Sequence, residues 1–168
     1  MTRSPGTASA RGVRTMAAEV IGGKKIALAL AALESKITRG GVLSVGFLEK
    51  SRYPAKKGTE PLHVAQVAFW NEFGTSRAPA RPFFRTTIQR QSPTWGDKLA
   101  KAVKATNYDG RTALALLGQS MRDDVENAIA QWSSPANAPS TVKRKGFDKP
   151  LVDTGVMQRA VDYEVSDK

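Results

Sequence analysis

Very few residues of this chain are of the types that carry out acid–base or metal chemistry. The only histidine is His63, and a hydrolase triad needs such a side chain as its general base. His63 stands just after Pro61 at the start of a predicted helix, where a histidine usually lies on the surface or caps the helix. The chain contains no cysteine, which excludes disulfides and thiolate metal sites.

One acidic cluster, formed by Asp123, Asp124 and Glu126, is the remaining place for a cation. Adjacent positions on a helix point about 100° apart, so these carboxylates do not converge as the ligands of a calcium or magnesium ion do. A solvated acidic helix face is the better interpretation. The sequence also lacks a Gly-x-x-x-x-Gly-Lys-Ser/Thr phosphate loop. We therefore expect no catalytic residue, no metal and no cofactor.

Positive charge is the strongest compositional feature, with a net charge of +11. Residues 1–60 carry 11 Lys/Arg against 4 Asp/Glu, residues 61–110 carry 7 against 3, and residues 111–168 carry 8 against 8. This asymmetry indicates an anionic partner, either DNA or an acidic protein, although basic segments also serve solubility alone. Without a helix-turn-helix signature, any DNA contact is expected to be with the phosphate backbone. The basic candidates are Lys24, Lys25, Lys56, Lys57, Lys143, Arg144 and Lys145.

The spacing of apolar residues defines the elements that position these groups. Helices are predicted at about 24–38, 62–73, 98–105 and 111–132, and strands at 42–48 and 161–165. Residues 83–91 fit either a helix or a strand, 133–149 are predicted to be a loop, and 156–160 are short and either helical or extended. In the helix of residues 62–73, Val64, Val67, Ala68 and Phe73 are expected to point inward.

These elements predict an α+β fold, in which a small antiparallel sheet is packed by several helices. The small polar residues of 1–15 predict a flexible basic arm, followed by one domain at 16–168 with long loops at 49–61 and 133–149. No apolar run reaches the length of about 18 residues that a membrane span needs. The first 15 residues also lack the apolar block of a secretory signal.

The segment from His63 to Arg85 combines a short helix with a rigid exit. Gly74 can end the helix in a conformation with positive φ, and Pro79 and Pro82 restrict the direction of the chain that follows. On an extended chain, the adjacent Phe83 and Phe84 would point to opposite sides. One ring would then enter the core and the other would meet a neighbour; the alternative is that both rings belong to the core.

This segment carries a resemblance to a known family. Asn71-Glu-Phe-Gly-Thr75, followed by Pro79-Ala-Arg-Pro-Phe-Phe-Arg85, resembles the tail-completion and head-tail joining proteins of tailed bacteriophages, including neck proteins and minor tail proteins of the lambda Z kind. Pro150-Leu-Val-Asp-Thr-Gly-Val-Met157, followed by Val161-Asp-Tyr-Glu-Val165, is similar to that family's closing segment. The two segments occur in the family's order, with helical sequence between them.

The triplet Asp153-Thr154-Gly155 also occurs in aspartic proteases, which need it in an all-β context and pair two copies across a dimer. Here long predicted helices precede the triplet and one short strand follows it, so the protease interpretation fails. We expect a structural turn, in which Asp153 accepts backbone hydrogen bonds or caps the next short element.

The resemblance implies an α+β subunit that works in an oligomeric ring at the neck or at the top of the tail. The symmetry common in phage tails implies a hexamer, located in the virion and assembled in the host cytoplasm. Its partners would be neighbouring connector, tail-tube or tail-terminator proteins, and genomic DNA passing through the lumen. The residues expected at such contacts are Trp70, Glu72, Phe73, Arg81, Phe83, Phe84 and Arg85, of which Glu72, Arg81 and Arg85 would form salt bridges.

Two other classes remain open at this point. The charge alone is compatible with a free-standing nucleic-acid-binding protein, whose DNA affinity would fall steeply with salt. A head or tail assembly factor that is absent from the finished virion would share the resemblance without remaining in the particle.

Overall fold

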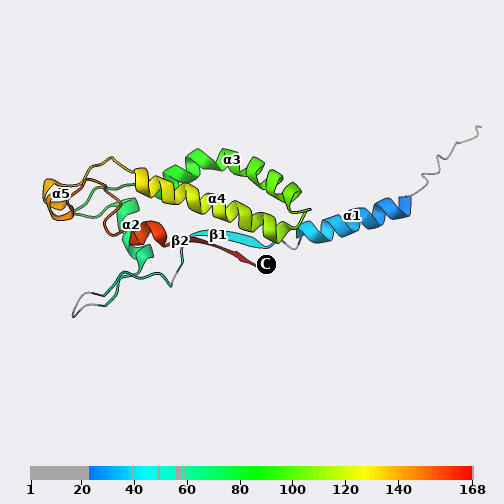
Figure 1. Cartoon of the computed structure of the whole chain (residues 1–168), viewed down its shortest axis with the longest axis horizontal. Helices are drawn as coiled ribbons and strands as arrows, with labels where there is room; N and C mark the ends of the chain where they lie inside the picture. Colours follow the sequence, from blue (N-terminus) through cyan, green and yellow to red (C-terminus); the bar gives the residue numbers. More distant parts are fainter. Residues whose placement is uncertain (1–22, 39, 49, 56–57, 59, 168) are drawn as a thin grey trace, which may run out of the picture.

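A computed structural model of the chain describes residues 23–38, 40–48, 50–55, 58 and 60–167. The expected arm of residues 1–15 and the basic candidates Lys56 and Lys57 lie outside these ranges. The helices are α1 (Gly23–Thr38), α2 (Val64–Phe73), α3 (Phe83–Ala105), α4 (Gly110–Gln131), α5 (Pro139–Lys145) and α6 (Val156–Arg159), and the strands are β1 (Val42–Phe47) and β2 (Val161–Ser166). The predicted α+β class is confirmed (Figure 1).

The two strands form one antiparallel pair, in which Val42 lies opposite Ser166 and Phe47 opposite Val161. Helix α4 packs on one face of this pair. A glycine on α4 permits this close approach, since a Cβ on Gly118 would lie 2.6 Å from the ring of Tyr163. The packing therefore covers the sheet on one side, as the alternation of apolar residues in both strands predicts.

Helices α3 and α4 lie side by side along the length of the molecule (Figure 1). The prediction of separate segments at 83–91 and 98–105 is wrong in one respect, because α3 continues through Pro93. A proline inside a helix removes one backbone hydrogen bond, yet α3 continues and packs along α4. Asp124 of α4 accepts a hydrogen bond from Trp95 Nε1 at 3.3 Å and pairs with Lys98 Nζ at 3.1 Å.

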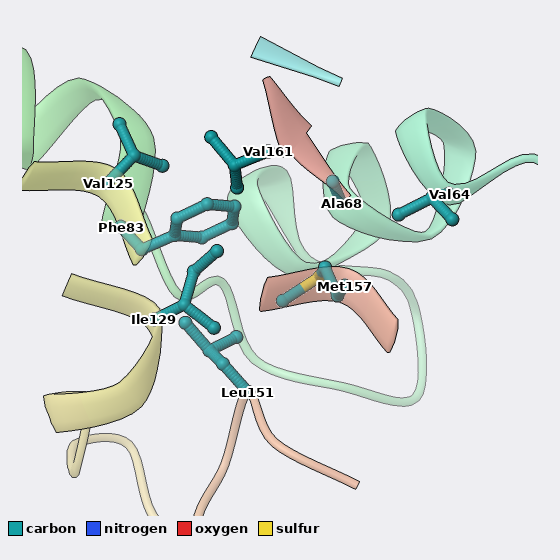
Figure 2. Close-up of a cluster of buried hydrophobic side chains, with 8 residues drawn as sticks. All are labelled: Val64, Ala68, Phe83, Val125, Ile129, Leu151, Met157 and Val161. Atoms are coloured by element: carbon teal, nitrogen blue, oxygen red, sulfur yellow. The ribbon is translucent and has the colours of Figure 1, made fainter. Parts of the chain in front are cut away.

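The core lies where α2, the start of α3, the second half of α4, α6 and β2 converge (Figure 2). Phe83, Ile129 and Val64 are its most deeply buried large side chains. Its members are Val64, Ala68, Phe83, Val125, Ile129, Leu151, Met157 and Val161.

Part of the predicted loop of residues 133–149 is helical, which corrects that prediction. Helix α5 begins with Pro139 in its first turn and ends at Gly146, which has a left-handed conformation with φ of 80°. Proline at the first position and glycine just past the end are the ordinary boundary signals of a helix. The segment of residues 156–160, for which two conformations fitted, forms the short helix α6.

The molecule is elongated, with α1 extending from one end and α5 lying at the other (Figure 1). The end of α1 meets the beginning of α4, where a Cβ on Gly110 would lie 2.7 Å from the carbonyl oxygen of Ile37. None of the helices among the described residues has the length and apolar character needed to cross a membrane.

Candidate subunit contact surface

Glu72 is the centre of the segment that carries the family resemblance. Its side chain comes from α2, is buried with 7 % of the residue exposed, and points at the first turn of α3. One carboxylate oxygen accepts a hydrogen bond from the backbone N–H of Phe84 at 2.9 Å, and the other accepts from the N–H of Arg85 at 3.2 Å. The residue before α3 is Pro82, which makes no side-chain cap. Glu72 therefore caps α3 from a different helix.

Arg85 completes this arrangement on the solvent side. Its Nε lies 3.2 Å from the Glu72 carboxylate, and its Nη2 donates to the backbone oxygen of Glu72 at 3.0 Å. The guanidinium group also lies 5.0 Å from the ring centre of Phe73, within range of a cation–π contact. The expected salt-bridge residues Glu72 and Arg85 are thus paired with each other inside one chain.

Arg81 is equally buried, with 7 % exposed. Its Nε donates to the carbonyl oxygen of Pro135 at 3.1 Å and its Nη2 to that of Ala136 at 3.2 Å. Its backbone N–H donates to the carbonyl oxygen of Asn71 at 2.6 Å. Burial lowers the pKa of Arg81, and the nearby charge of Asp148 acts in the opposite direction. Arg81 therefore ties the segment before α3 to the segment after α4 instead of facing solvent.

Gly74 ends α2 with φ of 78° and ψ of 177°, a region that is open almost only to glycine. A Cβ at this position would lie 2.8 Å from the backbone nitrogen of Ala80. The chain then folds back on itself, because Thr75 and Ala78 form an isolated bridge. The expected structural turn around Gly74, Pro79 and Pro82 is present, and it returns the chain to α2 before α3 begins.

Phe83 and Phe84 are the first two residues of α3, so they are not on an extended chain as the sequence argument assumed. Phe83 is fully inside the core, and its ring meets Phe47 edge to face at 6.2 Å. Phe84 is half-buried, and its ring lies 6.3 Å from that of Phe83. One of the two rings therefore enters the core. The two residues point in different directions because they are successive positions of a helix, and not of an extended chain.

The outward side of α2 carries three aromatic residues, Phe69, Trp70 and Phe73, which we call the α2 aromatic face. Their exposed fractions are 59 %, 39 % and 56 %, and the rings of Phe69 and Phe73 lie 4.6 Å apart. The prediction that Phe73 points inward is wrong, since Glu72 occupies the inward position beside it. Phe69 was not predicted as a contact residue; its place four residues before Phe73, on the same side of the helix, was the available signal.

The second motif forms the turn between α5 and α6. Gly155 precedes α6 in the left-handed conformation, with φ of 75°, and the carbonyl oxygen of Thr154 accepts from Arg159 Nη2 at 3.0 Å. Asp153 does not cap α6. It lies 3.7 Å from Arg144 Nη1, so the predicted role of Asp153 as a cap is wrong, whereas the turn itself is confirmed.

This turn borders a hollow of about 820 Å³ beside α2. The lining is mainly apolar and comes from three places: residues 53–55 with Glu60 and Leu62, the side of α2 around Val67, and residues 150–157. A smaller hollow of about 320 Å³ lies between the end of β1, α2 and the start of α3, and includes Phe69, Phe73 and Phe84. Both motifs of the family resemblance thus border concave apolar surface at one end of the molecule.

The basic candidates do not form one surface. Lys24 and Lys25 are exposed on α1, at the opposite end from α5 (Figure 1). Of these candidates, Arg144 and Lys145 line one hollow of about 270 Å³, together with Arg77, Arg81 and the acidic Asp153. Lys143 lies on the same helix, α5. Burial lowers the pKa of the Lys145 ammonium; Arg144 and Arg81 lower it further, whereas Asp153 and Asp148 raise it.

The residues considered for acid–base or metal chemistry have structural roles where the structure describes them. His63 is the residue before α2, and its backbone forms a bridge with Arg52. Asp123 lies 2.9 Å from Arg122, while Asp124 joins α4 to α3 and is not part of a solvated face. No group of three or more potential metal ligands occurs among the described residues.

Comparison with known proteins adds no relative to this description. No family model, curated protein or solved structure matches the chain.

Proposed function

We propose that this chain is a structural subunit of a tailed bacteriophage, which assembles into a ring at the head-tail neck or at the top of the tail and joins the tail to the head. The support comes from the resemblance of the two motifs and from the way they are folded. By the resemblance, the ring is a hexamer that contacts connector and tail proteins and surrounds the DNA path.

The observation that carries the proposal is the contrast between the charged and the aromatic residues of the first motif. Its charged residues Glu72 and Arg81 bind groups of their own chain, which makes the segment a rigid platform. On that platform the rings of Phe69 and Phe73 are held outward. Exposed, contiguous apolar surface on a small protein typically marks a protein–protein contact, and aromatic residues are enriched at such contacts.

The proposal is tested on the phage that encodes the chain. Purified particles should contain the protein in the amount of one ring each, measured by quantitative mass spectrometry against the major tail protein. Particles assembled without it should accumulate as separate heads and tails, and addition of the purified chain should restore joining. Absence of the chain from purified virions, together with a need for it during assembly, would favour the assembly-factor alternative.

Nucleic-acid binding is the second candidate, and the last turn of α5, with Lys143, Arg144 and Lys145 beside the exposed Arg77, favours it. Under this alternative the free chain binds duplex DNA, and replacement of Lys143 and Arg144 by Glu weakens binding. The slope of log affinity against log salt should become shallower by about 0.9 for each phosphate that the variant no longer neutralises. Replacement of Lys24 and Lys25 by Glu is the matched control, since it removes the same charge at the other end of the molecule.

A further inference from the structure

Helix α1 carries an apolar stripe in which, among the described residues, three side chains are exposed and one, Leu33, is half-buried. Ile26, Leu30, Leu33 and Ile37 follow one another at steps of four, three and four residues, which places them on one side of the helix. We call these four residues the α1 stripe. Leu30 is 60 % exposed, Ile26 55 % and Ile37 45 %, and α1 extends away from the body of the molecule (Figure 1).

The α2 aromatic face is the second open apolar surface. Helix α2 is apolar on nearly all sides: Val64 and Ala68 enter the core, while Phe69, Trp70 and Phe73 face outward. A helix that is apolar all round is normally buried all round. The described part of the chain covers one side of α2 and leaves the aromatic side exposed, which is what a surface for a partner would show.

The two surfaces lie at opposite ends of the molecule. The last turn of α1 meets the start of α4 at Gly110, whereas α2 packs with α6 near the far end of α4 (Figure 1). One molecule therefore cannot bring its own α1 stripe onto its own α2 aromatic face. Two copies can do so, because each copy presents one surface of each kind.

We propose that the α1 stripe of one copy packs against the α2 aromatic face of the next copy, so that copies join head to tail. This inference rests on the proposed function, because it supplies the subunit contact of the proposed ring. A contact between two different patches of the same chain is heterologous, and it closes into a ring when the rotation per copy allows. A self-paired contact would stop at a dimer instead.

The character of the two surfaces fits this partner. The seven side chains that make up the α1 stripe and the α2 aromatic face are all uncharged. The nearest charge is the Arg85 guanidinium over the Phe73 ring, and it is already paired with Glu72 of its own chain. The exposed parts of the three aromatic residues amount to roughly 300 Å². That is more than a third of the ~800 Å² that each partner contributes to a stable interface, and the neighbouring hollow, with Phe84 and Ala65, provides further contact surface.

The test uses two variants of the full chain, each damaged in one surface. Leu30→Glu places a charge in the α1 stripe, and Phe69→Glu places a charge in the α2 aromatic face. Ala31→Glu, on another side of α1, and Phe147→Glu, at a different exposed phenylalanine, are the matched controls. Circular dichroism first establishes that all four variants keep their helix content, and sedimentation velocity then measures the mass over a concentration series.

We expect the unmodified chain and both controls to form oligomers of more than two copies. Each surface variant alone should be monomeric at the concentrations where the unmodified chain forms oligomers. Its association should need a concentration at least about tenfold higher than that of the unmodified chain. An equimolar mixture of the two variants should form a dimer that grows no further. In that mixture, Leu30→Glu still has an intact α2 face and Phe69→Glu an intact α1 stripe, so one contact remains possible.

Three outcomes would overturn the inference. An unmodified chain that stays monomeric has no such contact. A mixture that stays monomeric shows that the two surfaces do not bind each other. A Phe69→Glu variant that still dimerises through α1 shows that the stripe pairs with itself.

The same series separates this inference from the proposed function. If both surface variants lose the oligomer but the protein does not join heads to tails, the proposed contact stands and the proposed function is rejected. If both surface variants still join heads to tails, the proposed function stands and the proposed contact is rejected.

Discussion

The buried carboxylate of Glu72 leads to the most detailed prediction about the stability of this chain. In Glu72→Ala, the backbone N–H groups of Phe84 and Arg85 lose their carboxylate acceptor at the start of α3, in partly buried surroundings. Removing a helix cap costs ~1 kcal/mol. Leaving a buried donor without a partner costs about 1–3 kcal/mol, and the cost is higher when the lost partner is charged. We expect the free energy of unfolding to fall by about 2–4 kcal/mol.

Urea denaturation followed by circular dichroism measures this change. For a chain of this size, each kcal/mol corresponds to a shift of about 2–4 °C in Tm, so Tm should fall by about 5–15 °C. Glu72→Gln keeps one acceptor oxygen and removes the charge, and it should cost about half as much. Replacement of the exposed Glu164 by Ala is the control, and it should change stability by less than about 0.5 kcal/mol.

A second variant shows which partners of Glu72 matter. More than half of the Arg85 side chain is exposed, and such ion pairs contribute between about 0 and 1 kcal/mol. Arg85→Met should therefore cost much less than Glu72→Ala. If the two variants cost the same, or if Glu72→Ala is as stable as the unmodified chain, the carboxylate does not act as the cap of α3.

Three further outcomes follow from close contacts. Gly118→Ala should destabilise the fold by about 1–3 kcal/mol through overpacking against Tyr163, offset in part by ~1 kcal/mol of helix propensity; a urea titration that shows a gain in stability would contradict this packing. Gly74→Ala should cost more than about 1 kcal/mol in the same titration, because of its positive φ and the 2.8 Å approach to Ala80, and a neutral result would argue against the observed turn. Phe83→Ala should cost about 3–5 kcal/mol, measured as the fall in Tm, and a shift of only a few degrees would place the ring outside the core.

Much of the fold follows from local patterns. The spacing of the apolar residues Leu114, Leu117, Met121, Val125 and Ile129 predicts the inward side of α4. Leu117, Val125 and Ile129 are buried, and Leu114 and Met121 are half-buried. Alternation predicts the strand that begins at Val161. Such patterns are readable because they repeat with the period of the element that contains them.

Two errors about the elements have different causes. Pro93 lies between the predicted segments 83–91 and 98–105, but α3 continues through it and packs along α4, where Trp95 and Lys98 bind Asp124. These contacts join positions far apart in sequence, so no local window contains them. Helix α5, in contrast, had readable signals in Pro139 and Gly146, which the basic and polar composition of the segment obscured.

The candidate contact surface was predictable in position but not in the role of each residue. The motif between residues 70 and 85 indicated the right region. A glutamate near the end of a helix is ordinarily exposed, so nothing in the sequence distinguished the buried Glu72 from a surface residue. The inward position of Glu72 is also the reason that Phe73 points outward, against the prediction.

By itself, the sequence determined the helical and strand periodicities, the α+β class, the turn glycines and the absence of cysteine, since each depends on residues that are near neighbours or on composition. Only the tertiary structure decided that β1 pairs with β2 from the other end of the chain, that Glu72 caps α3, and that Arg81 binds carbonyl groups beyond α4. It also decided which apolar side chains remain outside, on α1 and α2. These are outcomes of competition for a shared interior, and a burial that depends on distant partners has no local signature.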